Sequence, residues 1–133
     1  MATIHYEVTV NVGADAAWAA LREVADAPRL FAPVLIDGSL DGDLRTVKFA
    51  NGIVVHERIL DVDDKRHRVA YAALDGPGMS YHHASMQVVG GGPTQCTFVW
   101  ITDFLPAGIR DSLMPLIEGG AQALKSNLES GRI

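Results

Sequence analysis

Four side chains that can transfer protons occur within one part of the sequence: Glu57, Tyr71, Tyr81 and His83. Glu57 lies in NGIVVHERILDVDD, residues 51–64, an apolar run typical of a β-strand. A carboxylate there is costly unless it meets a partner, water or a ligand. In an apolar cavity its pKa would rise, which suits a general acid or base. We therefore take these four residues as candidate catalytic groups.

Structural roles compete with catalysis at these positions. Glu57 could instead form an ion pair at the surface with Arg45 or Arg58. Tyr71 and Tyr81 could be core aromatic residues whose hydroxyl groups are satisfied by neighbours. The sequence leaves both alternatives open.

No metal site or cofactor is expected. His56, His82 and His83 are close to Glu57 in sequence, but the alternation of a strand turns His56 and His82 to the outer face. The chain has no His-x-x-x-His pair of the kind a helix presents to zinc. The glycines at 90–92 precede a strand and not a helix, so they do not form a phosphate cradle.

The strand pairing offers an independent estimate of which side chains meet. If one turn centres on Asp64, Glu57 faces Tyr71, and if the next centres on Pro77, Tyr71 faces His83. Directly opposed residues lie on one face with Cβ atoms about 5 Å apart. This register predicts a polar row of Glu57, Tyr71 and His83, whereas a shift by one residue would turn a strand over.

The helices and strands that would position this polar row can be predicted along the chain. Period-two alternation predicts a strand over residues 3–12, and two short helices fit between residues 15 and 32. Turn residues then separate six further strands, over residues 34–40, 44–50, 53–62, 68–74, 80–89 and 95–104. Their short connections favour antiparallel neighbours, with a longer, bulged loop at Asn51-Gly52.

A long helix over residues 112–130 closes the chain, and its inner stripe includes Leu116, Gly120 and Asn127. Gly119-Gly120 and the alanines after them make its middle thin. A thin helix over a curved sheet leaves unfilled space. We therefore predict an α+β domain over residues 1–133, in which a curved seven-stranded antiparallel sheet surrounds the last helix and an internal hydrophobic cavity.

Composition narrows the class of partner. The net charge of −5 argues against nucleic acid, which favours a basic surface. The first residues alternate as in a strand and lack the apolar segment of a signal peptide, and no run is long enough to span a membrane. The single cysteine suits a reducing compartment. We expect a cytoplasmic protein, a monomer or homodimer.

This order of elements, together with RTVKFANGIVVHERILDVDD, SYHHAS, WITDFLP and LKSNLES, resembles the START-like (SRPBCC) superfamily over nearly the whole chain. This is the helix-grip fold of polyketide cyclase/dehydrase-like proteins, the birch-pollen allergen and plant abscisic acid receptors. The resemblance implies a cavity for a hydrophobic small molecule between the sheet and the last helix. It also implies that Glu57, Tyr71, Tyr81 and His83 face this cavity.

Ten further residues complete the predicted site as ligand contacts, and the register of the last strand leaves the orientation of Trp100 open. They are Phe49, Val55, Ile59, Ala73, Met79, Trp100, Leu116, Gly120, Ala123 and Asn127.

Two departures from the plant receptors bear on the ligand. Ala32 stands where those receptors present a lysine to the ligand carboxylate, and Val99 where they carry a second pocket carboxylate. These differences disfavour abscisic acid and other carboxylate ligands.

The sequence leaves three function classes open. The first is a cyclase or dehydratase acting by acid–base catalysis on an aromatic or polyketide-like molecule. The second is a carrier or sensor of such a molecule without chemistry. The third is a subunit whose apolar groove holds a protein helix, which would appear as a large exposed patch.

Overall fold

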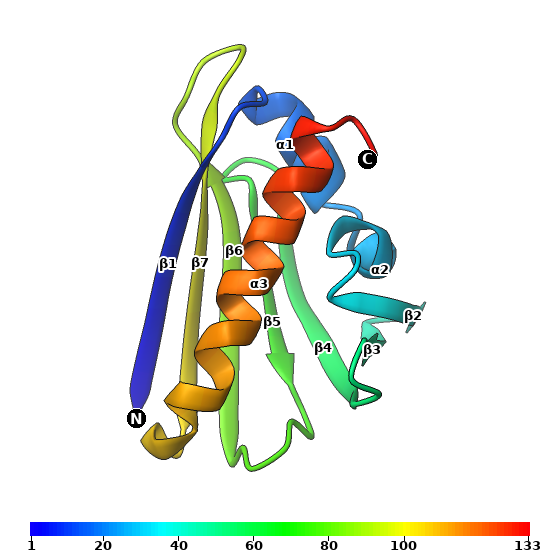
Figure 1. The fold of residues 1–133 in the computed structure, drawn as a ribbon, viewed down its shortest axis with the longest axis vertical. Helices are drawn as coiled ribbons and strands as arrows, with labels where there is room; N and C mark the ends of the chain where they lie inside the picture. Colours follow the sequence, from blue (N-terminus) through cyan, green and yellow to red (C-terminus); the bar gives the residue numbers. More distant parts are fainter.

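All seven strands of the computed structural model, which describes residues 1–133, belong to one antiparallel sheet in the order β1-β7-β6-β5-β4-β3-β2 (Figure 1). The strands are β1 Ala2–Val10, β2 Leu35–Asp41, β3 Leu44–Phe49, β4 Val54–Asp63, β5 Arg68–Ala73, β6 Tyr81–Val89 and β7 Cys96–Leu105. Strands β2 to β6 each pair with the next strand along the chain, and β1 pairs with β7. The predicted meander is confirmed.

The long helix α3 lies across the concave face of the sheet, with α1 at the upper end of the view and α2 beside β2 (Figure 1). The helices are α1 Ala14–Leu21, α2 Ala27–Leu30 and α3 Arg110–Glu129, with single 3₁₀ turns at Val24–Asp26 and Ala107–Ile109. The α+β helix-grip fold predicted from the sequence is therefore confirmed. None of these helices combines the length and the apolar character needed to cross a bilayer.

Burial along α3 is uneven, and this unevenness locates the cavity. The residues of α3 that are fully buried begin at Ile117 and continue to Leu128, toward its C-terminal end. The N-terminal half contributes only partly buried residues such as Leu113 and Leu116. Large core side chains, including Phe98 and Leu124, fill the space under the second half of the helix. The space under the first half is less completely filled.

The β3–β4 connection is a longer loop, as predicted from the alternation of β3. The amide of Phe49 donates to the carbonyl of Ile53 at 2.8 Å, and Val47 pairs with Val55. This register keeps Val47 and Phe49 on the inner face with Glu57. Arg45 has the same parity and is directly opposite Glu57.

Two hairpins differ from the predicted register. A bulge between Ile59 and Asp61 places Glu57 opposite Ala73, and Tyr71 pairs with Ala84. The first shift, from Tyr71 to Ala73 opposite Glu57, is an even number of residues, so Glu57 and Tyr71 still share the inner face. The second is odd, and it turns β6 over relative to the prediction.

Candidate ligand cavity

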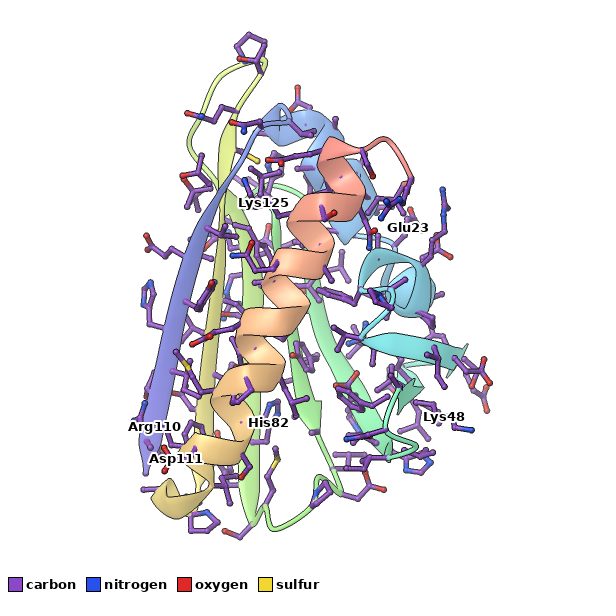
Figure 2. All side chains as sticks on the ribbon, in the orientation of Figure 1. Glu23, Lys48, His82, Arg110, Asp111 and Lys125 are labelled. Atoms are coloured by element: carbon purple, nitrogen blue, oxygen red, sulfur yellow. The ribbon has the colours of Figure 1, made fainter.

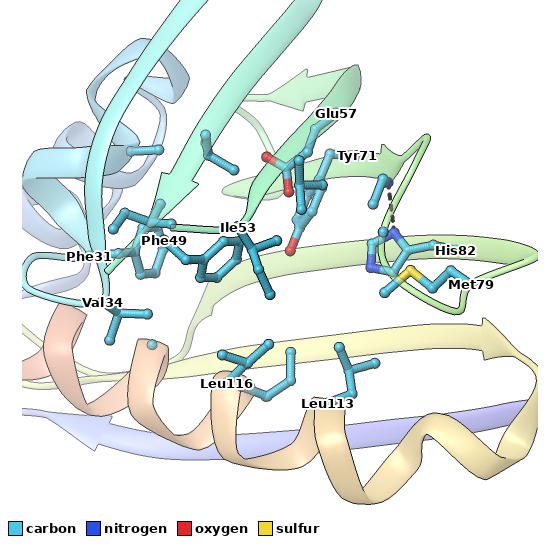
Figure 3. A pocket seen from close by; sticks show the side chains of 18 of the residues that line it. Phe31, Val34, Phe49, Ile53, Glu57, Tyr71, Met79, His82, Leu113 and Leu116 are labelled. Atoms are coloured by element: carbon cyan, nitrogen blue, oxygen red, sulfur yellow. Dashed lines mark hydrogen bonds between the residues drawn. The ribbon is translucent and has the colours of Figure 1, made fainter. Parts of the chain in front are cut away.

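A cavity of about 330 Å³ lies between the sheet and the N-terminal half of α3. Of the 25 residues that line it, 17 are hydrophobic, which is the usual character of a small-molecule site. Figure 3 shows Leu113 and Leu116 of α3 facing Glu57, Tyr71 and His82 across this space. The lining residues outside the fourteen candidate site residues are Ala27, Phe31, Val34, Leu35, Arg45, Val47, Asn51, Ile53, Gly76, Pro77, His82, Met86, Ile109, Ser112, Leu113 and Ile117.

Nine of the candidate site residues do line the cavity. They are Glu57, Tyr71, Phe49, Val55, Ala73, Met79, Trp100, Leu116 and Gly120. The open question about β7 is thereby answered, because Trp100 points inward. The placement of the other five candidates in the cavity, Tyr81, His83, Ile59, Ala123 and Asn127, was wrong.

The inverted register of β6 accounts for two of these errors. Because Tyr71 pairs with Ala84, the inward residues of β6 include His82 and exclude Tyr81 and His83. Tyr81 is 45% exposed, whereas His82 is only 8% exposed. The histidine of the cavity is therefore His82, which the alternation had assigned to the outer face.

The remaining three errors have local causes. Ile59 is next to the β4 bulge and packs at the margin of the core. Ala123 is buried under the filled half of α3, beyond the end of the cavity. Asn127 is also buried there, and its Nδ2 donates to the carbonyls of Leu30 at 3.0 Å and Ala32 at 2.9 Å. It holds α3 against the segment after α2 and does not face a ligand.

Glu57 forms a buried ion pair with Arg45 at the edge of the cavity. Both Nε and Nη2 of Arg45 lie 2.8 Å from Oε1 of Glu57, and Nη1 donates to the carbonyl of Val24 at 3.0 Å. The side chains are only 9% and 12% exposed. The pairing partner proposed from the sequence is thus correct, but the pair is not on the surface. Arg45 is the main residue that sequence reasoning failed to place in the site.

Burial is the largest influence on the pKa of Glu57. Removal from water raises the pKa of its carboxyl group above the ordinary value, and the charge and hydrogen bonds of Arg45 oppose part of that rise. Oε2 of Glu57 has no partner in the chain, and Figure 3 shows the carboxylate pointing into the cavity. One oxygen is therefore held by Arg45 and the other is open to a ligand.

Tyr71 and Trp100 form the second polar contact of the cavity. The indole Nε1 of Trp100 donates to the hydroxyl oxygen of Tyr71 at 3.2 Å, and the guanidinium of Arg45 lies 5.3 Å from the centre of the Tyr71 ring. Burial and the negative charge of Glu57 raise the pKa of Tyr71, so the phenol stays protonated. Its own proton has no acceptor in the chain and remains free to donate.

The tautomer of His82 follows from its hydrogen bond. The backbone amide of Ala73 donates to Nδ1 at 2.8 Å, and a nitrogen that accepts cannot carry a proton. The proton of the neutral ring is therefore on Nε2, which has no partner in the chain. Burial lowers the pKa of His82 to about 4, so this donor is present in the neutral ring at pH 7. Figure 2 shows His82 near the end of the sheet where α3 begins.

The low pKa of His82 makes stability depend on pH. Because the ring has a pKa of about 4 when folded and 6.5 as a free side chain, the unfolded chain binds more protons between these values, and stability falls as pH falls. We expect His82 to account for a loss of about 2 kcal/mol between pH 7 and pH 5.

Urea denaturation at the two pH values measures this loss. His82→Asn keeps an acceptor near the Nδ1 position but cannot be protonated, so its pH dependence should be smaller by that amount. His83→Asn is the comparison variant: the charge of His83 contributes less to the lowered pKa of His82 than burial does, so this variant should keep most of the wild-type pH dependence. Equal pH dependence in His82→Asn and wild type would contradict the assignment.

Gly120 makes room for the ring of Trp100 beneath α3. A Cβ at Gly120 would lie 2.9 Å from Cζ3 of Trp100, whereas a Cβ at Gly119 would meet only Val34, at 3.9 Å. Alanine in a helix interior gains up to about 1 kcal/mol over glycine, but overpacking a core costs about 1–3 kcal/mol. We expect Gly119→Ala to stabilise the protein and Gly120→Ala to be less stable than Gly119→Ala by at least about 1 kcal/mol in urea denaturation. Equal stability of the two variants would show that Trp100 is free to move aside.

With the fold and the cavity defined, the chain can be placed in a family. Residues 1–130 match the family described as polyketide cyclase / dehydrase and lipid transport. The chain belongs to this family, which implies a small hydrophobic ligand. No curated protein matches the sequence.

Solved structures show the same fold at low sequence identity. A putative uncharacterized protein from Bacillus thuringiensis has a TM-score of 0.85 and 18% identity, with 96% of this chain and 98% of that chain covered. A point mutant of norcoclaurine synthase from Thalictrum flavum, in complex with a transition-state analogue, has a TM-score of 0.74 and 20% identity, covering 99% and 96%. The di-domain ARO/CYC BexL from the BE-7585A biosynthetic pathway has a TM-score of 0.81 and 17% identity, covering 97% of this chain and 47% of that one.

Proposed function

We propose that this protein binds an aromatic or polyketide-like molecule in the cavity and catalyses proton transfer at an enolisable carbonyl, as in cyclisation or dehydration. The observation that carries the proposal is the Glu57 carboxylate. It has a raised pKa, one oxygen fixed by Arg45 and the other open to an apolar cavity. A buried carboxyl group of this kind is suited to general acid–base catalysis.

Tyr71 supplies the complementary group. Its free O–H proton can be donated to a ligand carbonyl oxygen, and the bond from Trp100 fixes the position of that hydroxyl. Glu57 would then remove a proton from the carbon next to the carbonyl, and the hydrogen bond from Tyr71 would stabilise the charge that develops on oxygen. The description of the family as polyketide cyclase / dehydrase supports this class of substrate, as do the names of the structural neighbours, ARO/CYC BexL and norcoclaurine synthase.

One set of observations favours a carrier or sensor instead. His82 is neutral, Tyr71 retains its proton, and the charge of Glu57 is matched by Arg45. A cavity whose polar groups are all held in these states can orient a ligand without chemistry. The two functions therefore share the cavity and differ in whether a proton leaves the bound molecule.

Deuterium exchange distinguishes the two functions. The probe is 2-tetralone, an apolar two-ring ketone. The methylene group between its carbonyl and its aromatic ring exchanges hydrogen with solvent through the enol. We expect deuterium from D₂O to enter at that carbon faster with the protein than in buffer alone. Proton NMR monitors the exchange. Saturable binding of 2-tetralone without acceleration would overturn catalysis and favour the carrier.

A further inference from the structure

Three polar groups in the cavity each keep one hydrogen-bonding function that the chain does not use. Oε2 of Glu57 can only accept when the carboxylate is ionised, and the Tyr71 hydroxyl and Nε2 of His82 have protons to donate. Because buried polar groups are normally hydrogen-bonded, a ligand that fills this cavity must supply the matching groups. The chemical class of the ligand can therefore be inferred from these three atoms.

Their positions divide into two ends. Glu57 on β4 is opposite Ala73 on β5, and the amide of Ala73 contacts His82 on β6, so the three residues form one row across three strands. Neighbouring strands are about 4.8 Å apart, which separates the backbones of Glu57 and His82 by roughly 10 Å. Figure 3 shows the Tyr71 ring between Glu57 and His82, and the centres of the Tyr71 and His82 rings are 5.7 Å apart. Glu57 and His82 are therefore the two groups that lie farthest apart. One ligand atom cannot satisfy all three groups.

The end at Glu57 and Tyr71 requires a hydroxyl group. A hydroxyl is the group that can donate to the free carboxylate oxygen and accept from the phenol at the same time. The end at His82 presents a single N–H donor and so requires an acceptor such as a carbonyl oxygen. Apolar side chains line the space between the ends, among them Phe49, Val55 and Leu116.

The charge of the site selects a neutral ligand. Arg45 is the only cationic side chain that lines the cavity, and its charge is already paired with Glu57. A ligand carboxylate would meet the free oxygen of Glu57 without a cation to offset it. Burial of an uncompensated charge is costly.

We propose that the ligand is a neutral, flat molecule of about two fused rings, with an enol or phenol hydroxyl at the Glu57–Tyr71 end and a carbonyl at the His82 end. The inference rests on the proposed function, because the hydroxyl is the enol form of the carbonyl on which Glu57 and Tyr71 would act. It adds the second carbonyl, the distance between the polar ends and the exclusion of carboxylates.

Isothermal titration calorimetry of the whole protein at pH 7 with four probes tests this ligand class. 6-Acetyl-2-naphthol has both polar ends, its methyl ether lacks the donor, 2-naphthol lacks the carbonyl, and 6-hydroxy-2-naphthoate carries a carboxylate. We expect the methyl ether and the carboxylate to bind at least about tenfold more weakly than 6-acetyl-2-naphthol, and 2-naphthol about three- to tenfold more weakly.

Two variants assign the far end of the ligand. His82→Asn keeps an acceptor for the Ala73 amide but lacks the Nε2 donor, so the ratio between 6-acetyl-2-naphthol and 2-naphthol should fall to about one. His83→Asn should retain the wild-type ratio. The four-probe comparison needs only the wild type and stands even if His82→Asn does not fold.

Each outcome decides a separate claim. Binding of all four probes within twofold of one another would overturn the ligand class and leave the proposed function standing. Failure of all four to bind at their solubility limits would overturn both. Tighter binding of the carboxylate than of 6-acetyl-2-naphthol would overturn the charge argument and with it the inference.

Discussion

Glu57→Gln is expected to lower the free energy of unfolding by about 3–5 kcal/mol, because it leaves the buried guanidinium of Arg45 without its anion. Oε1 of Glu57 is within 2.8 Å of two Arg45 nitrogens, and neither side chain is more than 12% exposed. If Glu57 were a solitary carboxylate in an apolar cavity, Glu57→Gln would leave the free energy of unfolding level or slightly raised, because a buried carboxylate costs more than a buried amide. The ion pair reverses that expectation.

An exposed ion pair provides the control. Arg58 and Asp43 are also 2.8 Å apart, but their side chains are 47% and 60% exposed. Asp43→Asn should therefore cost less than about 1 kcal/mol. Replacing both buried partners, as in Arg45→Met with Glu57→Gln, should recover most of the loss, because no unpaired charge remains. Urea denaturation at pH 7 measures all three, and a loss in Glu57→Gln no larger than in Asp43→Asn would contradict a buried pair.

The second large effect concerns catalysis. If Glu57 is the acid–base group, Glu57→Gln should slow the exchange of deuterium into 2-tetralone by about 10²–10⁴-fold, the usual contribution of general acid–base catalysis. The amide keeps the shape of the side chain but cannot take up a proton at this pH. NMR exchange rates at saturating 2-tetralone give the comparison, because they separate turnover from affinity.

Folded protein is needed for a valid comparison, so circular dichroism must accompany the rates. Where Glu57→Gln is too unstable, Arg45→Met with Glu57→Gln offers a folded background that also lacks the carboxylate. His83→Asn, on the outer face of β6, should keep the wild-type rate. Exchange at the wild-type rate in folded Glu57→Gln would remove Glu57 from the chemistry while leaving the cavity as a binding site.

The sequence predicted the fold well because its turns are chemically distinct. Glycine, proline and aspartate separate each strand from the next, and the short connections leave antiparallel neighbours as the simple solution. Parity then determined which face each side chain took. The predicted register of the β4–β5 hairpin was wrong by two residues, an even number, so Glu57 stayed on the inner face. The predicted register of the β5–β6 hairpin was wrong by one residue, so His82 faces inward where His83 was expected.

The position of Arg45 in the alternation of β3 indicated that its side chain faces inward, but its charge led us to expect a surface residue. Arg45 has the same parity as Val47 and Phe49 on β3, which marks it as inward-facing. A charged residue at such a position is unusual, and its presence indicates a buried partner. For Asn127 the sequence carried no such indication. Only the structure shows that its side-chain amide donates hydrogen bonds to the carbonyls of Leu30 and Ala32.

Native mass spectrometry with 6-acetyl-2-naphthol shows whether the cavity holds a small hydrophobic molecule. Ala73 lines the cavity, whereas its neighbour Ala72 has the opposite parity and does not. Phenylalanine at residue 73 should fill the space that the ligand needs. We expect one bound molecule on the wild type and on Ala72→Phe, and none on Ala73→Phe. Equal binding to Ala73→Phe, or no bound molecule on the wild type, would contradict binding in this cavity.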